Sequence, residues 1–153
     1  MKGTVSWQGG VAFLAESGSG HRIRVDGPPE HGGENRGVRP MEMLLLGAAA
    51  CSSFDVMAML AKGRQQVTDC VCEVAAERAE AVPAVFTRIH LHFRLSGRDL
   101  KESQVRRAVQ LSAEKYCSAS IMLAAAGVAV SHSYEICAAG GVDGSDRSGE
   151  PDG

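Results

Sequence analysis

Residues 40–61, PMEMLLLGAAACSSFDVMAMLA, form the most apolar stretch of the chain and decide the fold. Proline is tolerated at the first position of a helix, so the segment predicts a helix that begins at Pro40. Its few polar residues are Glu42, Ser52, Ser53 and Asp55. A helix that is apolar on all sides is buried in a protein core or in a membrane. The uninterrupted apolar run, residues 43–51, is far shorter than the roughly 20 residues that cross a bilayer. We therefore expect a core helix.

Such a helix is difficult to cover in a small protein. The chain has 153 residues, which is the size of a single domain. One domain of this size has few ways to bury a helix on every side. Two copies that pack their helices together, each covered by sheets, would solve the problem, so we expect a homodimer.

The composition excludes several classes of protein. Apolar residues make up 44% and charged residues 22% of the chain, which is typical of a globular protein and not of a disordered one. The net charge of −2 offers no basic excess for binding nucleic acid or an anionic membrane. The five cysteines are an odd number, and no signal peptide precedes them, which argues against a secreted disulfide scaffold. We expect reduced thiols and a cytoplasmic protein.

The remaining sequence predicts alternating strands and helices. Residues 138–153 are rich in glycine and aspartate and are expected to form a mobile acidic tail, which leaves residues 1–137 as the folded domain. Within that domain, strands are predicted at residues 1–8, 11–16, 21–26, 67–78, 85–96 and 128–136, and further helices at 100–115 and 118–126. This order indicates an α+β fold with antiparallel sheets around the long buried central helix.

Two cysteines lie where a thiol can be reactive. Cys51 falls midway along the apolar helix, and Cys117 stands at the start of the helix predicted at 118–126, close to Lys115. A helix N-terminus and a nearby lysine both stabilise a thiolate. One thiolate can attack a peroxide and become a sulfenic acid, which the second thiol converts to a disulfide. The alternative is that both cysteines are small apolar core residues.

The sequence around both cysteines resembles that of the OsmC/Ohr family. The stretch 39–51, RPMEMLLLGAAAC, is similar to the family's helix that carries the reactive cysteine, and 115–120, KYCSAS, is similar to its second cysteine motif. The segments 62–64, KGR, and 114–118, EKYCS, point to the YhfA-like branch. The resemblance covers nearly the whole chain to Ile136.

The resemblance implies an OsmC/Ohr-like fold, an intertwined homodimer and thiol-dependent reduction of small hydrophobic hydroperoxides in oxidative stress defence. Cys51 would be the peroxidatic thiol, Cys117 the resolving thiol and Glu42 the activating carboxylate. An external dithiol would supply electrons, and no organic cofactor or metal is implied. The match is incomplete, because Ohr-type members have glutamate where this chain has Met41. A shift of one residue turns a helical side chain by roughly 100°.

The arginine that partners this glutamate in the family comes from the N-terminal strands. Residues 5–16 contain no arginine, and Arg22, Arg24 and Arg39 are the candidate substitutes. Because the family's pair of activating glutamate and arginine is not matched, two alternatives to a hydroperoxide reductase stay open. One is non-enzymatic binding of a small hydrophobic ligand, and the other is a thiol sensor.

Two further groups of residues carry hypotheses. Asp55 follows Cys51 by four residues and shares its helical face, where a carboxylate would disfavour a thiolate or would bond to backbone or to a dimer partner. Cys70, Cys72, His90 and His92 lie on the two strands predicted at 67–78 and 85–96 and are of zinc-binding type. The alternation of apolar residues places the two cysteines and the two histidines on opposite faces, which argues against a shared metal.

Overall fold

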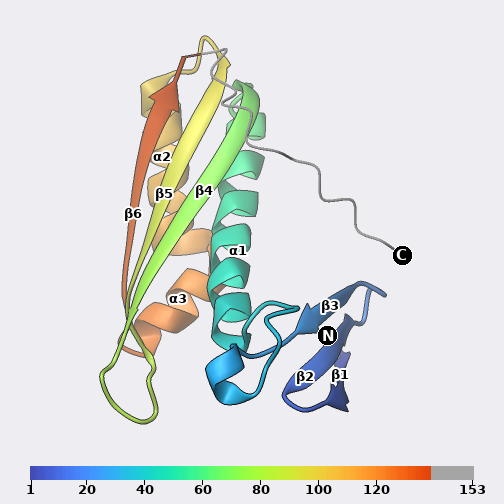
Figure 1. The fold of residues 1–153 in the computed structure, drawn as a ribbon. Coiled ribbons are helices and arrows are strands. Elements are labelled where there is room, and N and C mark those ends of the chain that lie inside the picture. Colours follow the sequence, from blue (N-terminus) through green and yellow to red (C-terminus); the bar gives the residue numbers. More distant parts are fainter. Residues whose placement is uncertain (139–153) are drawn as a thin grey trace. The chain divides into compact units, whose positions relative to one another are not determined.

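A computed structural model describes residues 1–138 of the chain (Figure 1). The chain divides into two compact units, Met1–Ala48 and the part from Ala49 onward, and each is described by itself. The single domain predicted over residues 1–137 stays a prediction. The predicted acidic tail lies outside the described residues, apart from Ala138.

The N-terminal unit contains the three strands predicted at residues 1–8, 11–16 and 21–26. Strands β1 (Gly3–Gly9), β2 (Ala12–Ser17) and β3 (Arg22–Val25) pair antiparallel in the order β1-β2-β3. The β1–β2 turn needs glycine, because Gly9 and Gly10 have φ values of 103° and 53°, which other residues rarely adopt. A short 3₁₀ helix, η1 (Pro29–His31), lies in the loop that follows β3.

Helix α1 (Pro40–Lys62) begins at the predicted proline and runs through both units. Its first turn is closed by the backbone N–H of Arg39, which donates to the Glu42 carboxylate at 3.0 Å. In the second unit, buried residues recur at every fourth position of α1 and so form one stripe along it: Ser52, Val56 and Leu60. Within residues 1–138, α1 is not buried on all sides, because Phe54 on another side of the helix is 77% exposed.

By length and composition, α1 is also long and apolar enough to cross a membrane. Of its most apolar 18-residue segment, 28% is buried inside the structure. Core helices of soluble proteins meet the same criterion.

The second unit is built on a mixed sheet. Strands β4 (Gln66–Arg78) and β5 (Phe86–Arg98) form a long antiparallel hairpin, as predicted. Strand β6 (Ala129–Cys137) pairs with β5 in parallel, so the prediction of antiparallel sheets was wrong for this pair. The reason is the helical connection between them, which returns the chain to the starting end of β5 and so makes the next strand parallel.

That connection consists of α2 (Glu102–Leu111), a π-helical turn η2 (Ser112–Tyr116) and α3 (Ser118–Ala125). The helix predicted at 100–115 therefore starts two residues later and changes type at Ser112. Helix α2 lies along the sheet (Figure 1), and their buried residues form the core of this unit: Ile89, Leu91, Phe93 and Leu95 of β5 with Val105, Ala108 and Val109 of α2. The fold class is α+β, as the sequence predicted.

Candidate functional site

The two predicted reactive cysteines lie together in the second unit, with Asp55 beside them. The sulfur atoms of Cys51 and Cys117 and a carboxylate oxygen of Asp55 all lie within 4.8 Å of one another. Helix α1 places Cys51 and Asp55 on one face, as their spacing of four residues predicts. Cys117 is fully buried, while Cys51 and Asp55 are half-buried. Solvent or a small substrate therefore reaches the pair from the side of Cys51.

The N-terminus of α3 is directed at both sulfur atoms. Cys117 is the N-cap residue of α3, and its Sγ accepts hydrogen bonds from the backbone N–H and the hydroxyl of Ser120, at 3.4 and 3.2 Å. The backbone N–H of Ala119 donates to Cys51. Such N–H groups have no partner inside their own helix and favour negative charge. The arrangement provides hydrogen bonds for a thiolate at either position.

The surroundings of Cys51 nevertheless favour the protonated thiol. The hydrogen bond from Ala119 is the largest single influence and lowers the pKa of Cys51. Burial, the interaction with Cys117 and the nearby Asp55 carboxylate act together in the opposite direction. The net effect raises the pKa of the Cys51 thiol above its ordinary value, so only a small fraction is thiolate at neutral pH.

A buried pair of hydroxyl groups holds the two cysteine-bearing segments together. Ser52 Oγ and Ser112 Oγ lie 2.9 Å apart, and Ser112 Oγ also donates to the carbonyl of Ser52 at 3.2 Å. Both residues are fully buried. The backbone N–H of Cys117 in turn donates to the carbonyl of Ser112 at 3.0 Å. The π-helical turn thus ties Cys117 to the residue next to Cys51.

Replacing Ser112 with alanine is expected to lower the free energy of unfolding by about 1–3 kcal/mol, because a buried polar group on Ser52 loses its partner. Urea denaturation measures this change. Ser103→Ala, at an exposed position of α2, is the matched control, and its effect should stay within about 0.5 kcal/mol. Equal effects of the two substitutions would show that the hydroxyl pair does not hold these segments.

Three of the four residues predicted to activate Cys51 pair with other residues of the N-terminal unit. Glu42 accepts the backbone N–H of Arg39 and faces its guanidinium, with Nε at 3.9 Å. Arg22 pairs with Glu16 at 2.7 Å. Arg24 forms no ion pair with any residue of the described part, 1–138. The activating role of Glu42 stays a prediction.

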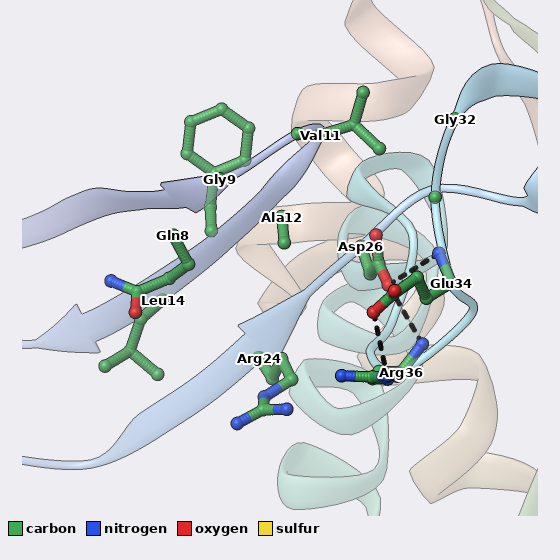
Figure 2. Close-up of a pocket in the computed structure, with 13 residues that line it drawn as sticks. Gln8, Gly9, Val11, Ala12, Leu14, Arg24, Asp26, Gly32, Glu34 and Arg36 are labelled. Atoms are coloured by element: carbon green, nitrogen blue, oxygen red, sulfur yellow. Dashed lines mark hydrogen bonds and ion pairs between the residues drawn. The ribbon is translucent and has the colours of Figure 1, made fainter.

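Arg24 lines a cavity of about 470 Å³ in the N-terminal unit (Figure 2). The buried Asp26 organises one wall of this cavity by accepting backbone N–H groups from Gly27, Glu34 and Arg36 at 2.7, 3.1 and 3.0 Å. These hydrogen bonds lower the pKa of Asp26, and the one from the backbone N–H of Arg36 contributes most. Asp26 is therefore a structural carboxylate held by three backbone N–H groups.

The other cysteines and histidines do not form the metal site considered from the sequence. Cys72 lies opposite Phe93 in the sheet, whereas His92 lies opposite Glu73. Cross-strand partners share a face, so the cysteines and histidines of these strands are on opposite faces, as predicted. His90 and His92 are bonded to serine hydroxyls of β6 instead, including that of Ser133 at 2.8 Å from each.

His132 of β6 was not among the predicted site residues. Its Nε2 atom is buried without a hydrogen-bond partner in residues 1–138, and it lines a cavity of about 630 Å³ that also reaches Ser120. Burial, with a smaller contribution from His90, lowers the pKa of His132, so the imidazole is neutral at pH 7. The roles of Ser112 and Ser120 were not predicted either; Ser120 is the last residue of the KYCSAS motif at 115–120, and Ser112 lies outside it.

Comparisons with known proteins agree with the fold. Residues 32–133 match the family described as OsmC-like protein. The chain is 50% identical over 139 residues to protein YhfA of Escherichia coli K12, covering 91% of this chain and all of YhfA. A hypothetical protein from Aquifex aeolicus has a similar structure, with a TM-score of 0.77 and 29% identity over 90% of this chain and 96% of that one. The organic hydroperoxide resistance protein OsmC of Legionella pneumophila shares the fold, with a TM-score of 0.66 and 19% identity over 88% and 97% of the chains.

Proposed function

Since the chain belongs to the OsmC-like family, we propose that it reduces organic hydroperoxides with the thiols of Cys51 and Cys117. The observation that carries the proposal is the placement of both sulfur atoms within 4.8 Å of each other at the N-terminus of α3. A role in oxidative stress defence follows from this chemistry. The names of structural neighbours such as the Legionella protein point in the same direction.

In the first step, the Cys51 thiolate attacks one oxygen of the hydroperoxide. An S–O bond forms, the O–O bond breaks, and the alkoxide leaves and takes a proton to become the alcohol. Cys51 is then a sulfenic acid. Cys51 is the attacking thiol because it is half-buried, whereas Cys117 is fully enclosed. The N–H of Ala119 stabilises the thiolate as it forms.

In the second step, Cys117 attacks the sulfenic sulfur of Cys51, a disulfide forms and water leaves. The sulfur atoms must approach from within 4.8 Å to the disulfide bond length of about 2.05 Å, which side-chain rotation of Cys51 can supply. A cytoplasmic dithiol then transfers two electrons and two protons to the disulfide and restores both thiols.

The proposal is tested by peptide mapping of the protein after one equivalent of cumene hydroperoxide. We expect one disulfide, between Cys51 and Cys117, which reopens with a dithiol, together with one equivalent of cumyl alcohol. Five unmodified thiols after prolonged exposure would overturn the proposal. A disulfide that forms once but supports no turnover with any dithiol would favour a thiol sensor instead.

The raised pKa of Cys51 predicts a strong pH dependence. Only the thiolate reacts, and below its pKa the thiolate fraction grows about tenfold per pH unit. The initial rate of Cys51 oxidation should therefore rise steeply between pH 6 and pH 8. Because the Asp55 carboxylate raises the pKa of Cys51, Asp55→Asn should increase the rate at pH 7, by about threefold to tenfold.

Stopped-flow measurement of thiol loss under single-turnover conditions tests both expectations. Glu80→Gln removes a remote, exposed carboxylate and should leave the rate unchanged. A pH-independent rate, or a slower Asp55→Asn variant, would contradict this account of the Cys51 environment.

We also propose that the functional form is a homodimer. Exposed apolar side chains along α1, with Leu44 at 60% and Phe54 at 77%, are costly in water and would be covered by a second copy. Sedimentation equilibrium should give twice the chain mass of 16.1 kDa. A monomer at micromolar concentration would contradict the dimer but not the reductase.

A further inference from the structure

We propose that Cys51, Asp55 and Cys117 bind one zinc ion in the reduced protein. Two cysteine sulfurs and one carboxylate oxygen converge within 4.8 Å of one another. Cysteine and aspartate are both ordinary zinc ligands, with bond lengths of about 2.3 Å to sulfur and about 2.0–2.2 Å to oxygen. In a tetrahedral site these bonds put the ligand atoms about 3.5–3.8 Å apart. Small side-chain rotations therefore complete the site.

The backbone already fixes the three ligand positions. Cys51 and Asp55 project from the same face of α1 four residues apart. Cys117 is held at the N-cap of α3, and its segment is tied to α1 by the buried Ser52–Ser112 pair. Residues brought together in this way lose little conformational entropy when a metal binds.

The hydrogen bonding of Asp55 distinguishes it from a structural carboxylate. Its Oδ2 atom is buried and accepts no hydrogen bond from any residue between 1 and 138. The buried Asp26, by contrast, accepts three backbone N–H groups. A buried carboxylate oxygen without a donor is costly, and a cation shared with two thiolates would remove that cost.

Three protein ligands leave the fourth zinc position open. Cys51 and Asp55 are half-buried, so water or a small ligand reaches the metal from their side. Zinc sites with three protein ligands and a water are of the open type, whereas structural sites are closed by four. We therefore expect an exchangeable ion and not one on which folding depends.

Zinc binding and disulfide formation exclude each other, because both use the same sulfur atoms. This consequence rests on the proposed reductase activity, which supplies the oxidant. One hydroperoxide and two protons would convert the zinc dithiolate into free Zn²⁺, the Cys51–Cys117 disulfide, one alcohol and one water. The two thiolates lose two electrons, and the O–O bond takes them up. The ion would thus protect the thiols until hydroperoxide releases it.

The direct test is titration of the reduced full-length chain with Zn²⁺ against a chromophoric chelator. We expect one ion per chain, and no binding after oxidation with diamide and removal of excess oxidant. Asp55→Asn, which preserves side-chain volume, should weaken binding by about tenfold or more, since even loss of an outer partner of a zinc ligand typically costs 10–100-fold. Cys51→Ser and Cys117→Ser should weaken binding further.

The matched control is the double variant Cys70→Ser/Cys72→Ser, which removes the two half-buried thiols of β4 and should bind zinc as the unmodified chain does. Absence of zinc binding by the reduced chain, or loss of binding in this control alone, would overturn the inference. Binding without disulfide formation by cumene hydroperoxide would support the zinc site and contradict the reductase. Disulfide formation without zinc binding would support the reductase and contradict the zinc site.

Discussion

Cys51→Ser is expected to abolish hydroperoxide consumption, with a loss of at least about a thousandfold, as is usual when a catalytic nucleophile is removed. A serine hydroxyl is almost never ionised at neutral pH, and the Ala119 N–H that faces this position cannot compensate for that. The rate at which cumene hydroperoxide decreases in the presence of excess dithiol measures this loss of activity. Residual turnover above one tenth would show that another thiol is the nucleophile.

Cys117→Ser is expected to separate the two steps. Its Cys51 should still consume one equivalent of hydroperoxide, because attack on the peroxide does not require the second sulfur. The resulting sulfenic acid has no neighbouring thiol to condense with, so it should persist and be trapped by dimedone. A single burst without an intramolecular disulfide is the expected result in this variant.

Cys137→Ser provides the control for both cysteine variants. Cys137 lies at the end of β6 and is half-buried like Cys51, but it contacts Glu135 and lies outside the Cys51 cluster. Its replacement should leave turnover unchanged. If Cys137→Ser loses turnover as Cys51→Ser does, the thiols react regardless of their position. The roles assigned to Cys51 and Cys117 from the geometry would then be wrong.

Local patterns in the sequence were sufficient for most elements of the fold. The alternation of Ile89, Leu91 and Phe93 with polar residues gave both strand β5 and its buried face, because side chains of a strand point to opposite faces in turn. Gly9 and Gly10 lie between the strands predicted at 1–8 and 11–16, and both have the positive φ values that the β1–β2 turn needs. Each of these features depends on neighbours only a few residues away.

The direction of β6 could not be predicted in the same way. It depends on how α2, η2 and α3 return the chain, and no periodicity within residues 128–136 distinguishes a parallel from an antiparallel neighbour. The π-helical turn at Ser112 was missed for a related reason. Its buried bond to Ser52 joins residues 60 positions apart, and such a contact leaves no mark on the local pattern.

The candidate site was predicted in part. Pairing of Cys51 with Cys117 came from the family resemblance, and the position of Asp55 beside Cys51 came from helical spacing. The hydrogen bond from Ala119 and the missing donor for Asp55 could not be foreseen, because backbone N–H groups are the same at every residue and only the fold directs them. The first feature lowers the pKa of Cys51, and the second is one basis of the proposed zinc site.

Phe93→Ala is expected to have the largest effect on stability, with a loss of about 3–5 kcal/mol in the free energy of unfolding. Phe93 is fully buried on β5, lies opposite Cys72 of β4 and Tyr134 of β6, and stacks on His132 with ring centroids 6.4 Å apart. Its removal leaves a cavity that the paired strands on both sides cannot close, because their hydrogen bonds fix the spacing of the sheet.

Urea denaturation at one fixed protein concentration measures the loss for Phe93→Ala. Met122→Ala, which truncates a side chain of α3 that is 71% exposed, should change the free energy by no more than about 0.5 kcal/mol. A loss below about 1 kcal/mol for Phe93→Ala would mean that the space collapses on truncation, which is inconsistent with a core fixed by the β4–β5–β6 ladder. A loss in the expected range would show that Phe93 fills a core that the paired strands β4, β5 and β6 hold at a fixed spacing.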